Sequence, residues 1–164
     1  MTVDEKPGKT AKARGTAERE MAVSAEQVFA TLEDGPSWSK WVPLIREVTW
    51  TSSQPFGKGA TRTVKLFGGI TFDEVFWAWE TNRRMSFSVT AASVRGVSAL
   101  TEVYEIVPLS SERCKLRWTF AGSHTGVLRK IEPFIGRILP IVQERSLKKL
   151  ERVAREAALS NNRG

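Results

Sequence analysis

Apolar and polar residues alternate with a period of two over most of the chain, which indicates β-strands with one buried face. The clearest case is segment 115–121, where Leu116, Trp118 and Phe120 alternate with charged or hydroxyl side chains. Turn residues separate successive segments, and the pair Gly68–Gly69 is a hairpin signal. The sequence predicts strands over 17–23, 45–52, 60–67, 70–80, 85–91, 97–107 and 115–121.

Two short helices are predicted between the first and second strands. Ser24 and Gln27 have the spacing of a capping box, which predicts a helix over 25–32. A second helical piece over 37–42 places Trp38 and Trp41 on one face, and Pro43 ends it.

The period changes to 3.6 residues from Gly126 to about Ala158, which predicts one long C-terminal helix. Pro133 and Pro140 each remove a backbone donor, so we expect the first half of this helix to be kinked or interrupted. Strands in a row followed by a helix predict an α+β fold in which the helix covers one face of the sheet. The predicted apolar stripe comprises Leu128, Ile131, Ile135, Ile138, Leu139, Val142, Leu150, Val153 and Ala157.

Composition excludes several classes of site. The 164 residues are typical of one domain. Cys114 is the only cysteine and His124 the only histidine, which rules out an intrachain disulfide, four-cysteine zinc modules and multi-histidine metal sites. We therefore expect no metal and no cofactor.

Most of the net charge of +7 lies in the two ends of the chain. Residues 1–15 have no aromatic residue and no apolar cluster, so we expect a disordered basic leader, a folded domain over 16–159 and a frayed tail over 160–164. The basic residues from Arg145 to Arg155 predict a solvated helix face, with contact to an anionic membrane as the alternative. Binding to nucleic acid is not expected. The leader lacks the apolar core of a secretory signal, and we expect a cytoplasmic monomer or homodimer.

Several segments carry a family resemblance: EREMAVSAEQVFATLED, WSKWVPLIREV, FGKG, FWAWETNRRMSFSV and KLRWTFAG ahead of the long helix. In this order they resemble the SRPBCC superfamily, also called START-like or helix-grip, and within it the polyketide cyclase/dehydrase branch. The resemblance covers roughly Ala17 to Ala158. It implies a curved antiparallel sheet of about seven strands wrapped around the C-terminal helix, forming a single ligand-binding domain.

A long helix in a strongly curved sheet leaves part of the concave volume unfilled, and that space is a candidate cavity for a hydrophobic ligand. The tryptophans and phenylalanines of the chain are suited to its walls, although a plain packed core would use the same residues. The residues expected to contact a ligand are Trp38, Trp41, Arg62, Val64, Phe72, Glu74, Phe76, Phe87, Leu100, Glu102, Tyr104, Trp118, Phe120, Ile131, Ile135 and Leu139.

Strand parity places charged residues on this apolar face. Glu102 shares a face with Leu100, and Arg62 and Glu74 each share a face with apolar neighbours. A buried carboxylate is costly, so Glu102 should be paired, protonated or functional. The charged residues could form one polar cluster, or a register slip or a simple internal ion pair could separate them. A bulge near Trp77 would reconcile the two parities of strand 70–80.

Two functions fit these observations. The first is binding of a lipid-like, polyketide-like or aromatic molecule in the cavity. The second is a polyketide cyclase or dehydratase, in which Glu102, Tyr104 or His124 would move protons. His124 is predicted in a loop at the cavity mouth, and its intrinsic pKa lies near neutrality. The sequence contains no catalytic signature, and we favour binding.

Overall fold

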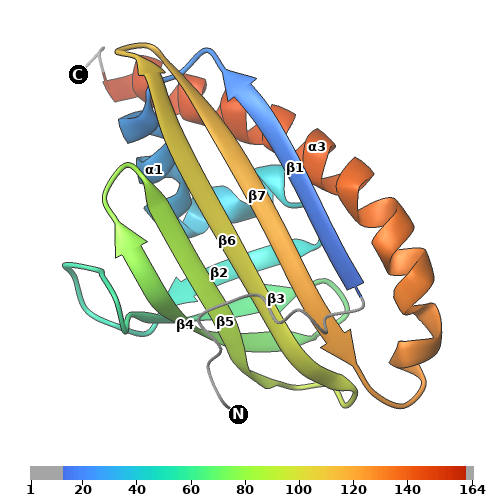
Figure 1. The fold of residues 1–164 in the computed structure, drawn as a ribbon. Coiled ribbons are helices and arrows are strands. Elements are labelled where there is room, and N and C mark those ends of the chain that lie inside the picture. Colours follow the sequence, from blue (N-terminus) through green and yellow to red (C-terminus); the bar gives the residue numbers. More distant parts are fainter. Residues whose placement is uncertain (1–12, 162–164) are drawn as a thin grey trace.

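The computed structural model describes residues 13–161, in which seven antiparallel strands form one curved sheet and a long helix crosses its concave face (Figure 1). The strand order is β1-β7-β6-β5-β4-β3-β2. This is the predicted α+β helix-grip architecture. The elements are β1 (Ala13–Met21), α1 (Ala25–Glu33), the 3₁₀ helix η1 (Gly35–Ser37), α2 (Trp38–Trp41), β2 (Ile45–Trp50), β3 (Thr61–Leu66), β4 (Thr71–Glu80), β5 (Arg84–Ala92), β6 (Val97–Ser110), β7 (Arg113–His124) and α3 (Leu128–Asn161).

The predicted capping box starts α1. The backbone N–H of Gln27 donates to Ser24 Oγ at 3.2 Å, and the backbone N–H of Ser24 donates to Gln27 Oε1 at 3.0 Å. These bonds satisfy backbone donors that a helix start leaves free. α1 then buries Val28, Phe29 and Leu32 against the sheet and α3.

The predicted bulge in β4 is confirmed. The register with β5 shifts between Phe76 and Ala78, which lets Phe76 and Trp79 pack together with their ring centroids 5.2 Å apart. Trp77 lies between them in sequence, and its Nε1 donates to Ser88 Oγ at 3.1 Å. Because of the bulge, Phe76 and Trp79 pack on the same side of β4, and Trp77 is buried as well through its contact with Ser88.

Both predicted boundaries of the folded domain are wrong. β1 begins at Ala13, so residues 13–15 belong to the sheet and not to the leader, and residues 1–12 lie outside the described part. Ala13 and Gly15 suit this position because both pair with β7 on the buried side of β1, and Gly15 lies directly against α3. At the other end α3 continues to Asn161, two residues into the expected tail, and residues 162–164 lie outside the described part.

Strand β6 also continues further than predicted, through Pro108 to Ser110. Its pairing with β5 ends at Arg84 and Glu105, so Pro108, which has no N–H to donate, lies where β6 has no β5 neighbour. His124, expected in a loop, is the last residue of β7 and pairs with Val97.

Helix α3 is continuous through Pro133 and Pro140, so of the two expected effects of these prolines the interruption does not occur. Its inner face is also rotated from the predicted stripe: Ile131 is 46% exposed, whereas Glu132 is 2% exposed. The cause is the bonding of Glu132 to the end of β7, described below. Among residues 13–161, no helix combines the length and apolar content that crossing a bilayer requires.

Close contact between α3 and β1 depends on Gly15. A Cβ atom at this position would lie 2.4 Å from Gln143 Oε1 and 2.8 Å from the Leu139 side chain. At Gly136, on the same helix, a Cβ would meet nothing within 4 Å. The two glycines are therefore a matched pair for measuring this contact.

We expect Gly15→Val to lower the free energy of unfolding by about 1–3 kcal/mol, because α3 must move away from β1 to admit the side chain. Gly136→Ala should raise it by up to about 1 kcal/mol through helix propensity alone. Urea denaturation followed by circular dichroism measures both. Equal effects of the two substitutions would contradict the close approach.

Candidate ligand-binding site

The concave face has a closed end, filled by aromatic rings. Trp41 lies between Trp38 and Trp118, with ring centroids 4.6 Å and 5.9 Å away, and Tyr104 stacks on Trp118 at 5.4 Å. None of these rings is more than 5% exposed. Phe76 and Phe87 extend the cluster, with centroids 5.0 Å apart. At this end, therefore, the expected ligand-contact aromatics pack on one another as a core.

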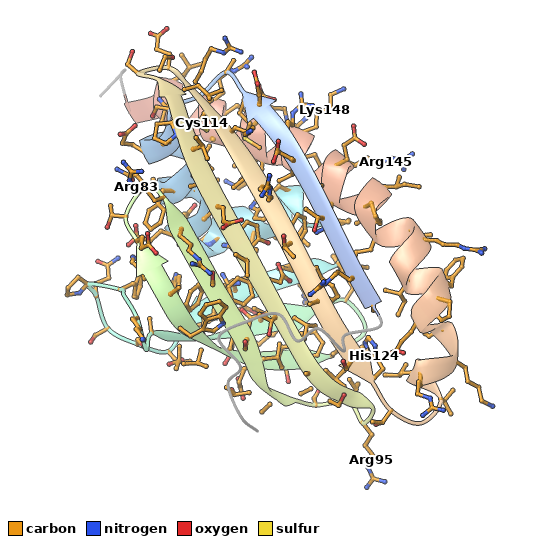
Figure 2. All side chains as sticks on the ribbon, in the orientation of Figure 1. Arg83, Arg95, Cys114, His124, Arg145 and Lys148 are labelled. Atoms are coloured by element: carbon orange, nitrogen blue, oxygen red, sulfur yellow. The ribbon has the colours of Figure 1, made fainter. Side chains whose placement is uncertain are left out.

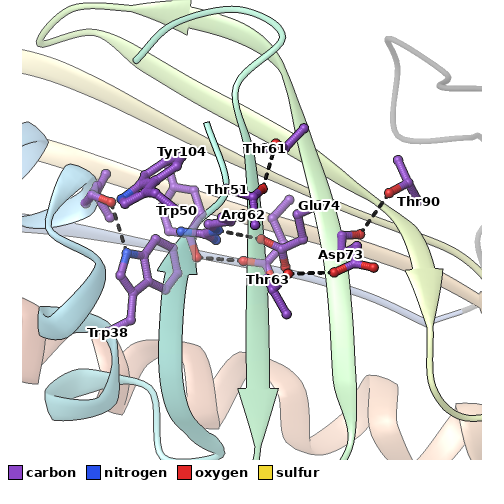
Figure 3. Close-up of polar contacts among 12 residues, drawn as sticks. Trp38, Trp50, Thr51, Thr61, Arg62, Thr63, Asp73, Glu74, Thr90 and Tyr104 are labelled. Carbon is purple, nitrogen blue, oxygen red and sulfur yellow. Dashed lines mark hydrogen bonds and ion pairs between the residues drawn. The ribbon is translucent and has the colours of Figure 1, made fainter. Parts of the chain in front are cut away.

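An ion pair is buried inside this aromatic cluster. Arg62 of β3 faces Glu74 of β4 in register, and Arg62 Nε donates to Glu74 Oε2 at 2.6 Å (Figure 3). The guanidinium carbon lies 4.1 Å from the Trp38 ring centroid and 4.4 Å from that of Phe87. Stacked rings and an opposite charge are what a buried cation needs to offset the loss of water.

Burial raises the pKa of the Glu74 carboxyl, and the Arg62 guanidinium opposes this rise. Arg62 is 1% exposed, and its Nη1 has no hydrogen-bond partner among the described residues. The ion pair is therefore held within the core, and the Nη1 group of Arg62 is left without an acceptor among the described residues.

Glu102 of β6 is the second carboxyl on the concave face. Its Oε2 accepts hydrogen bonds from Tyr104 Oη at 2.6 Å and from Trp118 Nε1 at 2.8 Å. Burial, together with the charge of Glu74, raises its pKa to about 7, against the opposing effect of the Tyr104 hydrogen bond. Near neutral pH this carboxyl is therefore divided between its acid and its carboxylate form.

The expected polar cluster forms in part. Arg62 and Glu74 bond directly, while Glu102 bonds to Tyr104 and Trp118 and senses the pair through its charge. Phe87 is the register partner of Glu102 on β5 and separates the two groups across the sheet. Burial also raises the pKa of Tyr104 well above its ordinary value, so its hydroxyl stays a neutral donor.

Beyond Glu102 the concave face becomes more open. Leu100 and Phe120, which flank Glu102 on this face, are half-buried, as are Ile135 and Leu139 on α3. Fully buried Leu116 and Ile106 occupy the corresponding places at the closed end. Solvent therefore reaches apolar side chains at the end of the concave face where Glu102 lies. We call the concave side of the sheet the cup and this part of it the open end. Of the other expected contacts, Val64 is buried and Phe72 is half-buried.

His124 does not join this group. Its backbone N–H donates to Glu132 Oε1 at 2.7 Å, and its Nδ1 lies 3.2 Å from the same oxygen. Figure 2 places His124 at the end of β7, beside the start of α3. The contacts tie the helix to the strand, and they account for the inward position of Glu132.

Sequence reasoning missed Glu132 and Gln143 on the inner face of α3, whereas Ser146 lies on the predicted apolar stripe, four residues after Val142. Glu132, Gln143 and Ser146 are at most 2% exposed, and Gln143 Nε2 donates to the Trp118 carbonyl at 3.2 Å. Within the described chain, Gln143 Oε1, Ser146 Oγ and Trp41 Nε1 are buried without a hydrogen-bond partner. Helical spacing of Glu132 with Leu128, a residue of the predicted stripe, was the available signal.

Residues 12–155 match the family model described as polyketide cyclase / dehydrase and lipid transport. An uncharacterized protein of Mycobacterium tuberculosis, Rv2574, is 38% identical over 133 residues, which are 81% of this chain and 79% of that protein. The Mycobacterium bovis protein Mb2604, also uncharacterized, matches to the same extent.

Solved structures share the fold. A START superfamily protein from Mycobacterium smegmatis has a TM-score of 0.73 at 15% identity, covering 88% of this chain and 98% of that one. The Zhui aromatase/cyclase from Streptomyces sp. R1128 has a TM-score of 0.64 at 16% identity, covering 88% and 93%. At these identities the likeness concerns the architecture alone.

The raised pKa of Glu102 predicts a stability change with pH. Between its ordinary value of 4.5 and about 7, the folded chain holds a proton at Glu102 that the unfolded chain has lost. The contribution of Glu102 to the free energy of unfolding is therefore highest below pH 4.5 and falls as the pH rises to about 7. Relative to Glu102→Gln, which stays neutral, the wild type should lose about 1–3 kcal/mol between pH 5 and pH 8.

Urea denaturation at both pH values measures this difference. Glu105→Gln, three residues along β6 on the opposite face, is the control and should leave the pH dependence of the wild type unchanged. A wild type and a Glu102→Gln variant with parallel pH profiles would show that Glu102 titrates normally.

Proposed function

We propose that this chain, which belongs to the polyketide cyclase/dehydrase and lipid transport family, binds a hydrophobic small molecule. The proposed site is the open end of its concave face. The observation that carries the proposal is the position of Glu102. This carboxyl has a pKa of about 7 and lies where the packed aromatic core ends and half-buried apolar side chains begin.

The chemistry of Glu102 suits a neutral ligand with one polar group. As an acid it donates a hydrogen bond to a carbonyl, and as a carboxylate it accepts one from a hydroxyl. Tyr104 and Trp118 hold its Oε2 in place, so the group is oriented before a ligand arrives.

Apolar contacts would supply most of the affinity. Leu100, Phe120 and Leu139 surround the open end and are only half-buried in the protein alone. Covering them removes apolar surface from water, which contributes about 25 cal/mol for each Å². A ligand with a carbon chain or fused rings and one oxygen function matches this combination of surfaces.

One observation favours catalysis as a second candidate function. A carboxyl with a pKa of about 7 is able to take up and release a proton at neutral pH, as a polyketide cyclase or dehydratase requires. The Arg62–Glu74 pair is enclosed by rings, however, and His124 is bonded to Glu132. Among the described residues, Tyr104 is therefore the one titratable group that is hydrogen-bonded to Glu102 and could act with it. This smaller set of groups favours binding.

Binding should be detectable with the apolar dye N-phenyl-1-naphthylamine, whose fluorescence rises when it leaves water. We expect saturable binding to the wild type and a loss of affinity of about tenfold or more in Leu100→Trp, because the larger side chain occupies the open end. Val107→Trp, on the opposite face of β6, is the control and should bind as the wild type does. Equal affinities of both variants would place the dye elsewhere.

The catalytic alternative has its own measurement. Incubation with a poly-β-ketone thioester should then give ring closure at a rate that changes near pH 7, and Glu102→Gln should slow it by about 100-fold or more. Glu105→Gln should retain the rate. Turnover that is unaffected by Glu102→Gln would remove this carboxyl from any catalytic role.

A further inference from the structure

The outer face of α3 carries a continuous apolar line along its first half. The residues follow each other at intervals of four and three, which places them on one side of the helix. Apolar patches of this kind on a folded domain mark interaction sites. The line comprises Val127 (78% exposed), which immediately precedes α3, and Ile131 (46%), Phe134 (64%), Ile138 (39%) and Ile141 (54%) of the helix.

Cations continue the same line along the second half of the helix. Arg145 follows Ile141 at the next helical interval, and Lys148, Lys149 and Arg152 come after it, all exposed. Figure 2 shows Arg145 and Lys148 projecting away from the sheet. The outer face of α3 thus changes from apolar to cationic near its middle.

Carboxylates balance little of this charge. Glu132 is buried, and Glu151 bonds to Arg19 and Arg155. Glu156 lies 3.8 Å from Arg152, while Glu144 forms no ion pair within the described chain. The outer face is therefore strongly positive beside its apolar line.

A groove runs along the cationic half, between α3 and the segment that follows α2. It has a volume of about 480 Å³ and is lined by Pro43, Val142, Arg145, Ser146, Lys148, Lys149 and Arg152. Ser146 Oγ is buried there without a partner in the described chain, so it has a free hydrogen-bond donor. Leu44, next to Pro43, is 64% exposed. Cations, a hydroxyl and an apolar tip together suit the headgroup of an anionic phospholipid.

We propose that the outer face of α3 docks the protein on an anionic bilayer. The apolar line enters the boundary between headgroups and acyl chains, as an interfacial amphipathic helix does. The cations and the groove beside them contact lipid phosphates. The cationic half is complementary in charge to lipid phosphates, whereas the same face of a second copy carries the same positive charge. Docking is independent of any ligand in the cup, so it extends the proposed function and does not rest on it.

Sedimentation with vesicles tests the docking. We expect the full-length protein to bind vesicles of phosphatidylcholine with 30% phosphatidylglycerol. Its affinity for pure phosphatidylcholine vesicles should be lower by about tenfold or more. The variant Phe134→Gln/Ile138→Gln should lose about tenfold or more in affinity. The matched control Val107→Gln/Leu109→Gln, which changes exposed apolar residues of β6, should bind normally.

A charge reversal tests the cationic half. Arg145→Glu should weaken binding about tenfold, and Arg83→Glu, in the turn between β4 and β5, should leave it unchanged. Sedimentation velocity without lipid gives the oligomeric state. Equal binding to both vesicle types, equal effects of the two reversals, or a dimer that Phe134→Gln/Ile138→Gln converts to monomer would overturn the proposal.

Discussion

Burial of one cation organises the closed end of the molecule. Arg62 lies near the start of β3 on the inward face of the sheet, so the chain must compensate its loss of hydration. Glu74 supplies the opposite charge in register, and the rings of Trp38 and Phe87 lie against the guanidinium group. The helix α2, which carries Trp38, is held against the sheet in part by this requirement.

The same electrostatics shapes Glu102. This carboxyl lies beyond the rings that enclose Arg62, so the cation does not neutralise it through a hydrogen bond. It shares the low-polarity surroundings and feels the negative charge of Glu74, both of which favour its protonated form. Burial is the main reason that this carboxyl, at the border of the aromatic core, is a weaker acid than usual, and the two charges of the buried pair act on it in opposite directions.

Helix α3 serves two different environments along its length. Its second half buries Leu147, Leu150 and Ala154 in the core, whereas the inner face of its first half is polar at Glu132 and Gln143. A helix that is not held by an apolar core needs other contacts, and here His124 and the Trp118 carbonyl provide them. Ile131, Phe134, Ile138 and Ile141 of the first half turn outward and form most of the docking line.

Strand periodicity was enough to determine the face on which each charged residue lies. Arg62, Glu74 and Glu102 point inward as their parity requires, and the bulge near Trp77 follows from the conflict between its parity and that of Phe76. Parity is a local property of the backbone, so seven strands, a capping box and a terminal helix were readable from the residues alone.

Tertiary structure decided which partners those residues meet. Glu102 bonds to Tyr104 and Trp118 rather than to Arg62, rings fill the closed end of the cup, and Glu132 replaces Ile131 on the inner face of α3. These outcomes depend on register between distant strands and on the rotation of a helix about its axis. A change of one helical residue turns a side chain by about 100° at little local cost, so the contacts with β7 and β1 determine that rotation and not the sequence of α3 itself.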